Sequence, residues 1–296
     1  MSRKILVTGA RGQLGTDLVQ LLSGSYEVIG VDIDEVDIRD DSRVSPLIQS
    51  VRPDIVLHSA AFTDVDGCES DRRAAEAVNV DGTYNIARSC RDIGARMVFY
   101  STDYVFAGDK DSPYVETDPT DPRTVYGMTK LQGERKVAEL LEDHAILRIA
   151  WLYGAHGKNF VKTMVRLGEQ QLRAKDAGET VQPLKVVDDQ RGNPTWTVEV
   201  ALQTAKIIES GLTGIIHCTA EGETSWYSFA RTLFEQLHMD VQLRPCATRE
   251  FPRPAPRPAR SSLENQRLKE SGQNIMREYK AALAAFLVNH GGALSE

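Results

Sequence analysis

Short apolar runs alternate with longer amphipathic segments along the first half of the chain. The runs that we interpret as strands are residues 4–8, 27–31, 54–58, 96–100 and 145–150. Their nearly continuous Val, Ile and Leu content is what strands need when helices cover both faces of a sheet. The segments that we interpret as helices are residues 13–22, a stretch after Ser42, 73–93 and 126–142. This alternation predicts an α/β fold built on a doubly wound parallel sheet.

The alternation becomes less regular after residue 150. Helices are expected at residues 159–172, 197–210, 225–237 and 277–287, and strands at 184–187 and 214–218. A proline-rich segment, residues 251–258, cannot be helical. We predict a larger unit formed by residues 1–150, to which residues 186–218 return. Residues 151–185 and 219–296 form a smaller part, and a ligand cleft is expected between the two.

Composition narrows the class of protein. The chain has 296 residues, of which 41% are hydrophobic, enough for one large domain or two closely joined ones. Its four cysteines lack the spacing of a zinc site or a disulfide framework. A formal net charge of −7 argues against a nucleic-acid partner, since such proteins usually carry a basic face. Neither a signal-peptide pattern nor an apolar run of about 18 residues occurs, so we expect a soluble cytoplasmic protein without membrane contact.

Three glycines, Gly9, Gly12 and Gly15, lie where the first strand turns into the first helix. In this pattern the first glycine makes the tight turn, the second lets the backbone approach a pyrophosphate, and the third lets helix and sheet pack closely. The helix N-terminus adds unpaired N–H groups and partial positive charge for the phosphates. The motif therefore predicts a Rossmann-type NAD(P)-binding domain in residues 1–150 and leaves the smaller part to bind substrate.

The choice between the two cofactors is left open by two residues of opposite charge. Asp32 ends the second strand about 20 residues after the glycine turn, where a carboxylate accepts from the adenosine ribose. It favours NADH, because it would repel the 2′-phosphate of NADPH. Arg11, inside the loop, is either a partner for that phosphate or a solvated loop cation.

Tyr126 and Lys130 lie four residues apart, on one face of a predicted helix. A free tyrosine has a pKa near 10, and a neighbouring ammonium lowers the pKa by stabilising the phenolate. The Lys130 ammonium can also bind the nicotinamide ribose. Thr102 or Ser101, at the carboxyl end of a neighbouring strand, can donate to the same substrate oxygen. Together with the glycine loop, this pair indicates transfer of a hydride and a proton to a carbonyl, rather than an ordinary surface helix.

The third strand and the residues that follow it also belong near this site. Residues 60–63 follow the third strand and are expected to lie against the nicotinamide half of the cofactor. His58, in that strand, is interpreted as a packed residue rather than a catalyst. The six histidines show no metal-binding spacing, which predicts no metal site.

The glycine loop and the Tyr-x-x-x-Lys pair resemble those of the extended short-chain dehydrogenase/reductases. Further segments are similar to one branch of them, the dTDP-4-dehydrorhamnose reductase family. They are residues 12–15, 52–54, 60–66, 100–106, 125–130, 148–154, 189–195 and 257–263. The resemblance extends over nearly the whole chain and implies the Rossmann-type fold already predicted.

The resemblance implies reduction of the C4 ketone of dTDP-4-dehydro-L-rhamnose to dTDP-L-rhamnose, with NADPH or NADH as cofactor. It makes Tyr126 the proton donor, Lys130 its partner and Thr102 a hydroxyl donor, and it places Asp103 and Trp151 against the nucleotide sugar. The residues that it places around the cofactor are Gly12, Gln13, Leu14, Asp32, Asp37, Ile38, Ala61, Phe62 and Thr63. We add Arg260 for the substrate diphosphate, since its planar fork suits phosphate oxygens.

Some members of this family bind Mg²⁺ at a dimer interface. Asp17 matches one of those acidic positions, but no second ligand is identified, so the sequence leaves a homodimer open and does not support a metal bridge within it. Other functions stay open on this fold, namely a nucleotide-sugar epimerase or dehydratase and a non-enzymatic regulatory subunit. A dehydratase would carry Asp-Glu after the strand threonine, whereas this chain has Asp103 and Tyr104. A proline-motif ligand in residues 252–258 is a third, weaker alternative.

Overall fold

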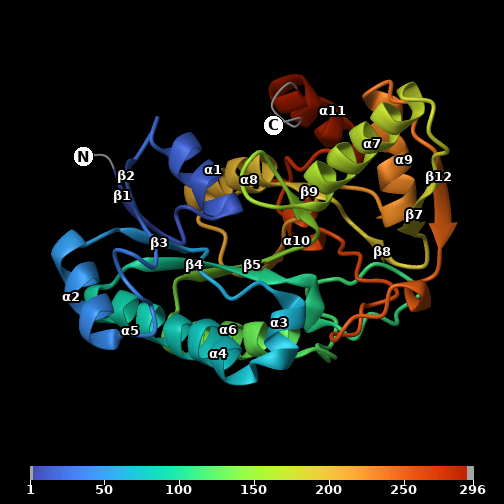
Figure 1. The fold of residues 1–296 in the computed structure, drawn as a ribbon. Coiled ribbons are helices and arrows are strands. Elements are labelled where there is room, and N and C mark those ends of the chain that lie inside the picture. Colours follow the sequence, from blue (N-terminus) through green and yellow to red (C-terminus); the bar gives the residue numbers. More distant parts are fainter. Residues whose placement is uncertain (1–2, 292–296) are drawn as a thin grey trace.

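The computed structural model describes residues 3–291, which fold around a six-stranded parallel sheet (Figure 1). The strand order is β10-β5-β4-β3-β1-β2. The strands are β1 (Lys4–Thr8), β2 (Glu27–Val31), β3 (Ile55–His58), β4 (Arg96–Thr102), β5 (His144–Ile149) and β10 (Gly214–His217). Every neighbouring pair is parallel. The predicted doubly wound α/β fold is confirmed.

Helices cover both faces of the sheet, as its apolar strands require. Figure 1 shows α1 (Gln13–Leu22) and α8 (Thr197–Ser210) on one face, and α2 (Asp41–Val51), α5 (Thr83–Ile93) and α6 (Val125–Leu140) on the other. Strand β1 illustrates the alternation, since Ile5 and Val7 join the core under α1 and α8. Leu6, between them, joins the core under α2, α5 and α6.

The single helix predicted over residues 73–93 is interrupted. It consists of α4 (Arg72–Glu76), a π-helical turn η1 (Ala77–Gly82) and α5, and a short helix α3 (Val65–Ser70) precedes it. The π turn directs the buried Asn79 toward the loop after β3, where its side-chain oxygen accepts from the amide of Phe62 at 2.8 Å. Such turns are frequent at functional sites, and no periodicity in the sequence indicates one.

The second half of the chain adds α7 (Phe160–Asp176), α9 (Trp226–Gln236), α10 (Gln266–Glu270) and α11 (Tyr279–His290). Its short strand pairs are β6 (Leu152–Tyr153) with β9 (Thr195–Trp196), β8 (Arg191–Gly192) with β11 (Thr224–Ser225), and β7 (Leu184–Val187) with β12 (Leu243–Cys246). A separate aromatic core, which includes Tyr153, Phe229 and Phe286, lies beneath α7, α9 and α11. Strand β7 is therefore outside the main sheet, whereas β10 and α8 belong to it.

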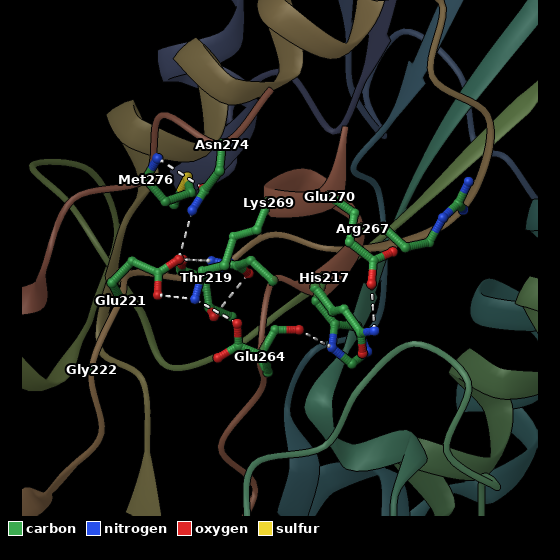
Figure 2. Close-up of polar contacts among 12 residues, drawn as sticks. His217, Thr219, Glu221, Gly222, Glu264, Arg267, Lys269, Glu270, Asn274 and Met276 are labelled. Carbon is green, nitrogen blue, oxygen red and sulfur yellow. Dashed lines mark hydrogen bonds and ion pairs between the residues drawn. The ribbon is translucent and has the colours of Figure 1, made fainter. Parts of the chain in front are cut away.

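A polar network fastens the C-terminal segment to the end of β10. Figure 2 shows Glu221 bound by Asn274 and Lys269, at 2.8 Å in both cases. At the end of β10, the Nδ1 of His217 contacts the main-chain oxygen of Glu264 at 3.0 Å. These contacts hold the segment that precedes α11 against the sheet. Within residues 3–291, no helix has the length and apolar character needed to cross a bilayer.

Candidate active site

A cavity of about 890 Å³ opens along the carboxyl ends of strands β1 to β5, where open parallel sheets bind their ligands. It is lined by every residue that the sequence placed at the cofactor or the chemical step. For the substrate, Asp103 and Trp151 line it as well, whereas Arg260 does not. Its far wall comes from the second half of the chain and includes Gln190, Trp226 and Arg257.

The glycine loop is shaped for a close approach of backbone and phosphate. Gly9 has φ = +70°, and a Cβ there would lie 2.7 Å from the amide nitrogen of Ala60. A Cβ on Gly15 would lie 2.0 Å from the carbonyl oxygen of Gly9. Both contacts exclude a side chain, so the start of α1 lies directly against the loop. This geometry fits the pyrophosphate of a dinucleotide at the N-terminus of α1.

The adenosine end of the cavity contains both acids and cations. Asp32 accepts the backbone N–H of Arg11 at 2.8 Å, so the carboxylate ties the glycine loop to the end of β2. The Arg11 guanidinium is paired with Asp34 and Glu35, each at 2.7 Å. The guanidinium that was one candidate partner for the 2′-phosphate is therefore already paired with two carboxylates. The choice between NADH and NADPH stays open.

The hydroxyl-bearing residues of the chemical site meet at the end of β4. The buried Thr102 donates to Asp103 at 2.9 Å, and both line the cavity beside Tyr126. Burial raises the pKa of Asp103 to about 6. Ser101, the alternative donor, also lines the cavity, and its buried hydroxyl has no hydrogen-bond partner in the described part of the chain.

The expected lowering of the Tyr126 pKa is not what this geometry produces. Burial, followed by the negative charge of Asp103, raises the pKa of Tyr126, and only the Thr102 hydroxyl acts in the opposite direction among its main causes. The Lys130 ammonium lies 4.0 Å above the centre of the Phe99 ring, rather than on the phenol. Burial, which the spacing to Lys130 does not report, dominates the pKa of the phenol. Tyr126 is accordingly held protonated, which suits a proton donor.

His58 lies beneath this site and is fully buried, with Nδ1 2.7 Å from the Thr8 hydroxyl and Nε2 3.2 Å from that of Thr83. Burial lowers its pKa to about 3, so the ring is neutral. The packed role predicted for it is confirmed.

Two stacked tryptophans contribute a flat aromatic surface to the cavity. The Trp151 and Trp226 rings stack with centroids 3.5 Å apart and planes at 5°. Trp151 has φ = +46°, and the absence of a side chain at Gly192 leaves room for its ring. The indole N–H of Trp226 donates to Gln190 at 3.1 Å. Trp226 and Gln190 were missed from the sequence, since only the folding of the second half brings them to the cavity.

The structure separates the two arginines of the segment after the prolines. Arg257 lines the cavity, and its guanidinium is held by Asp66 of α3 at 2.8 Å. Arg260 instead forms a two-point contact with Glu223, at 2.6 and 3.0 Å. Of these two arginines Arg257 alone lines the cavity, although both belong to the same sequence motif. Spacing alone could not distinguish them.

Asp17, the acid considered for a metal, is a buried residue of α1. One of its oxygens lies 3.6 Å from His156, and the other has no hydrogen-bond partner within residues 3–291. Over the same residues, no group of three or more His, Cys, Asp or Glu side chains is arranged to hold a metal ion.

Comparison with known proteins gives matches over nearly the full length. The family model for the RmlD substrate binding domain matches residues 3–291. The chain is 41% identical to the dTDP-4-keto-6-deoxy-D-glucose reductase of Streptomyces niveus, with 96% of each chain covered. The structure of a dTDP-4-dehydrorhamnose reductase from Clostridium acetobutylicum has a TM-score of 0.92 at 41% identity, covering 97% of this chain and 99% of that one. The Bacillus anthracis dTDP-4-dehydrorhamnose reductase in complex with NADP also has a TM-score of 0.92, at 36% identity and 98% and 100% coverage.

These matches confirm the resemblance drawn from the sequence motifs. The chain belongs to the family of the RmlD substrate binding domain.

Proposed function

We propose that this protein is an NAD(P)H-dependent reductase that converts the C4 ketone of dTDP-4-dehydro-L-rhamnose to the hydroxyl of dTDP-L-rhamnose. The observation that carries this proposal is the meeting of Tyr126, Thr102 and Lys130 in the cavity that starts at the glycine loop. The relatives support it, since their names describe reductases of dTDP-linked keto sugars.

Each residue of the chemical site has a separate role in the reduction. The reduced nicotinamide, when bound, supplies the hydride to the ketone carbon. Tyr126 gives the proton to the ketone oxygen, and its raised pKa keeps that proton in place until the oxygen gains negative charge. Thr102 gives its one hydroxyl proton to Asp103 in the structure, and that proton would turn to the same oxygen when the substrate binds. Lys130, which lines the cavity, would hold the nicotinamide ribose and supply positive charge to it.

The nucleotide sugar fits the part of the cavity beside the two tryptophans. The stacked rings of Trp151 and Trp226 offer apolar area beside the sugar or the base, and Arg257 offers a guanidinium to the diphosphate. The division predicted from the sequence stays a prediction, with residues 1–150 and 186–218 holding the cofactor and residues 151–185 and 219–296 holding the substrate. A homodimer and a cytoplasmic location stay predictions from the sequence.

The activity is tested with purified protein, NADPH and freshly prepared dTDP-4-dehydro-L-rhamnose. We expect the near-ultraviolet absorbance of NADPH to fall with one dTDP-L-rhamnose formed for each NADPH oxidised. An epimerase or dehydratase would convert the sugar without net NADPH consumption, and a regulatory subunit would do neither. Either result would replace the proposal with the corresponding alternative.

Replacing Arg257 by alanine is expected to raise KM for the sugar nucleotide by roughly 10–100-fold, the usual loss for a hydrogen bond to a charged group. The dissociation constant of NADPH should stay close to that of the wild type. Arg260→Ala is the matched comparison, because Arg260 pairs with Glu223 outside the cavity. A larger KM effect at Arg260 would restore the sequence-based assignment of the diphosphate contact.

Asp32→Ala is expected to shift the ratio of kcat/KM for NADPH over NADH upward, by roughly tenfold, because a like charge no longer faces the 2′-phosphate. Both values should also fall together, since the variant releases the Arg11 amide that Asp32 holds. The ratio separates the two effects. A ratio equal to that of the wild type would show that Asp32 does not face the adenosine ribose.

A further inference from the structure

A buried ion pair lies one helical turn beyond Lys130. Glu134, also on α6, is bound by Arg148 of β5 through two hydrogen bonds, Nε to Oε1 at 3.0 Å and Nη2 to Oε2 at 2.7 Å. The side chains are 4% and 2% exposed. Burying such a pair costs several kcal/mol in lost hydration, and packed apolar residues are often as stable. Stability alone therefore does not explain why this ion pair is buried here.

The spacing along α6 relates Glu134 to Lys130. Residues four apart share one face of a helix, so Glu134 lies on the same face as Lys130. The lysine is almost wholly buried over the Phe99 ring, and a buried ammonium without a nearby negative charge loses its proton readily. Both carboxylate oxygens of Glu134 are already taken by Arg148. The acid can thus act on the lysine by its charge without binding it.

Three other ionisable groups near the chemical site do not supply this charge. On α6 itself Tyr126 is held protonated, and on β3 the buried His58 is neutral. Asp103, from the turn after β4, acts on the phenol of Tyr126. Glu134 is the one described acid whose charge is a main influence on the lysine, and Arg148 lies behind it.

We propose that Glu134 and Arg148 are positioning residues for Lys130. Arg148 fixes the carboxylate of Glu134, whose charge favours the ammonium form of Lys130. Because both carboxylate oxygens are occupied by Arg148, they do not draw the ammonium away from the cofactor side of the cavity. This inference rests on the proposed reductase function, in which the charge of Lys130 serves the nicotinamide ribose.

The proposed role of Glu134 and Arg148 can be measured through the ionisation of Lys130. Burial lowers the pKa of Lys130 to about 7, and Glu134 opposes that change. The ammonium is therefore present below pH 7 and lost as the pH rises through it, and NADPH binding to the free protein should weaken over the same range. Lys130→Met should remove this step and so identify it with the lysine.

The deciding experiment follows NADPH binding by fluorescence as a function of pH in two variants. Glu134→Gln keeps a partner for Arg148 but removes the charge, so the midpoint should move down by about one pH unit. Arg148→Met frees the carboxylate to bind Lys130 directly, so the midpoint should move up and kcat should fall. Glu134→Asp, which keeps the charge, should restore the wild-type midpoint.

Glu199 and Arg277 provide a matched control, since they form another pair with a buried glutamate, away from the cavity. Glu199→Gln should lower stability without moving the midpoint. Equal midpoints in Glu134→Gln, Arg148→Met and the wild type would overturn the proposal and leave a purely structural pair. If only one of Glu134→Gln and Arg148→Met folds, the direction of its midpoint shift alone tests the proposal. Absence of ketone reduction by the wild type would instead count against the proposed function, because the binding midpoints do not depend on turnover.

Discussion

Tyr126→Phe is expected to lower kcat by roughly 10²–10⁴-fold, the usual contribution of a positioned acid. The variant loses only the hydroxyl, and the ring still packs edge-on against Tyr104 with centroids 5.7 Å apart. The cavity should therefore keep its shape, and the dissociation constant of NADPH should change little. Single-turnover rates of ketone reduction measure the effect on the chemical step directly.

The control for this variant is Tyr26→Phe, at a partly buried tyrosine that packs against the core under α1 and lies outside the cavity. It should leave kcat and KM at wild-type values. Near wild-type turnover by Tyr126→Phe would mean that another group protonates the substrate oxygen. The buried Asp103, with its pKa raised to about 6, would then be the first group to examine.

The sheet and the cofactor loop could be predicted because each depends on local sequence. Apolar strand runs such as residues 4–8 specify burial on both faces, and the glycines that follow specify a turn that no side chain can enter. The carboxyl ends of parallel strands then share one edge of the sheet. This is why Thr102 and Tyr126, far from the loop in sequence, could be placed in the same cavity.

The features that were missed depend on contacts between distant segments. Arg257 and Arg260 share one motif, and only the pairing of Arg260 with Glu223 decides which of them faces the cavity. Trp226 is the first residue of an amphipathic helix whose sequence pattern does not indicate a binding site. It stacks on Trp151, whose backbone is left-handed. The pKa of Tyr126 depends on burial, which the spacing to Lys130 does not report.

Gly15→Ala is expected to weaken NADPH binding by roughly 10–100-fold. The added Cβ would lie 2.0 Å from the Gly9 carbonyl oxygen and 2.9 Å from the Cα of Ala10. Both neighbours are backbone atoms, so no side chain can rotate away, and α1 must move from the loop. Overpacking of this kind typically costs 1–3 kcal/mol, and the shift also withdraws the helix N–H groups from the phosphates.

The measurement is the dissociation constant of NADPH by fluorescence, with Tm recorded in parallel. Gly24→Ala is the matched control, because a Cβ at Gly24 meets no atom closer than 4.0 Å, the carbonyl oxygen of Leu21. It adds the same methyl group in open space just after α1 and should leave the NADPH affinity unchanged. Unaltered NADPH affinity in Gly15→Ala, with a lowered Tm, would show that the loop relaxes without loss of phosphate contacts. The close approach of α1 would then serve folding rather than cofactor binding.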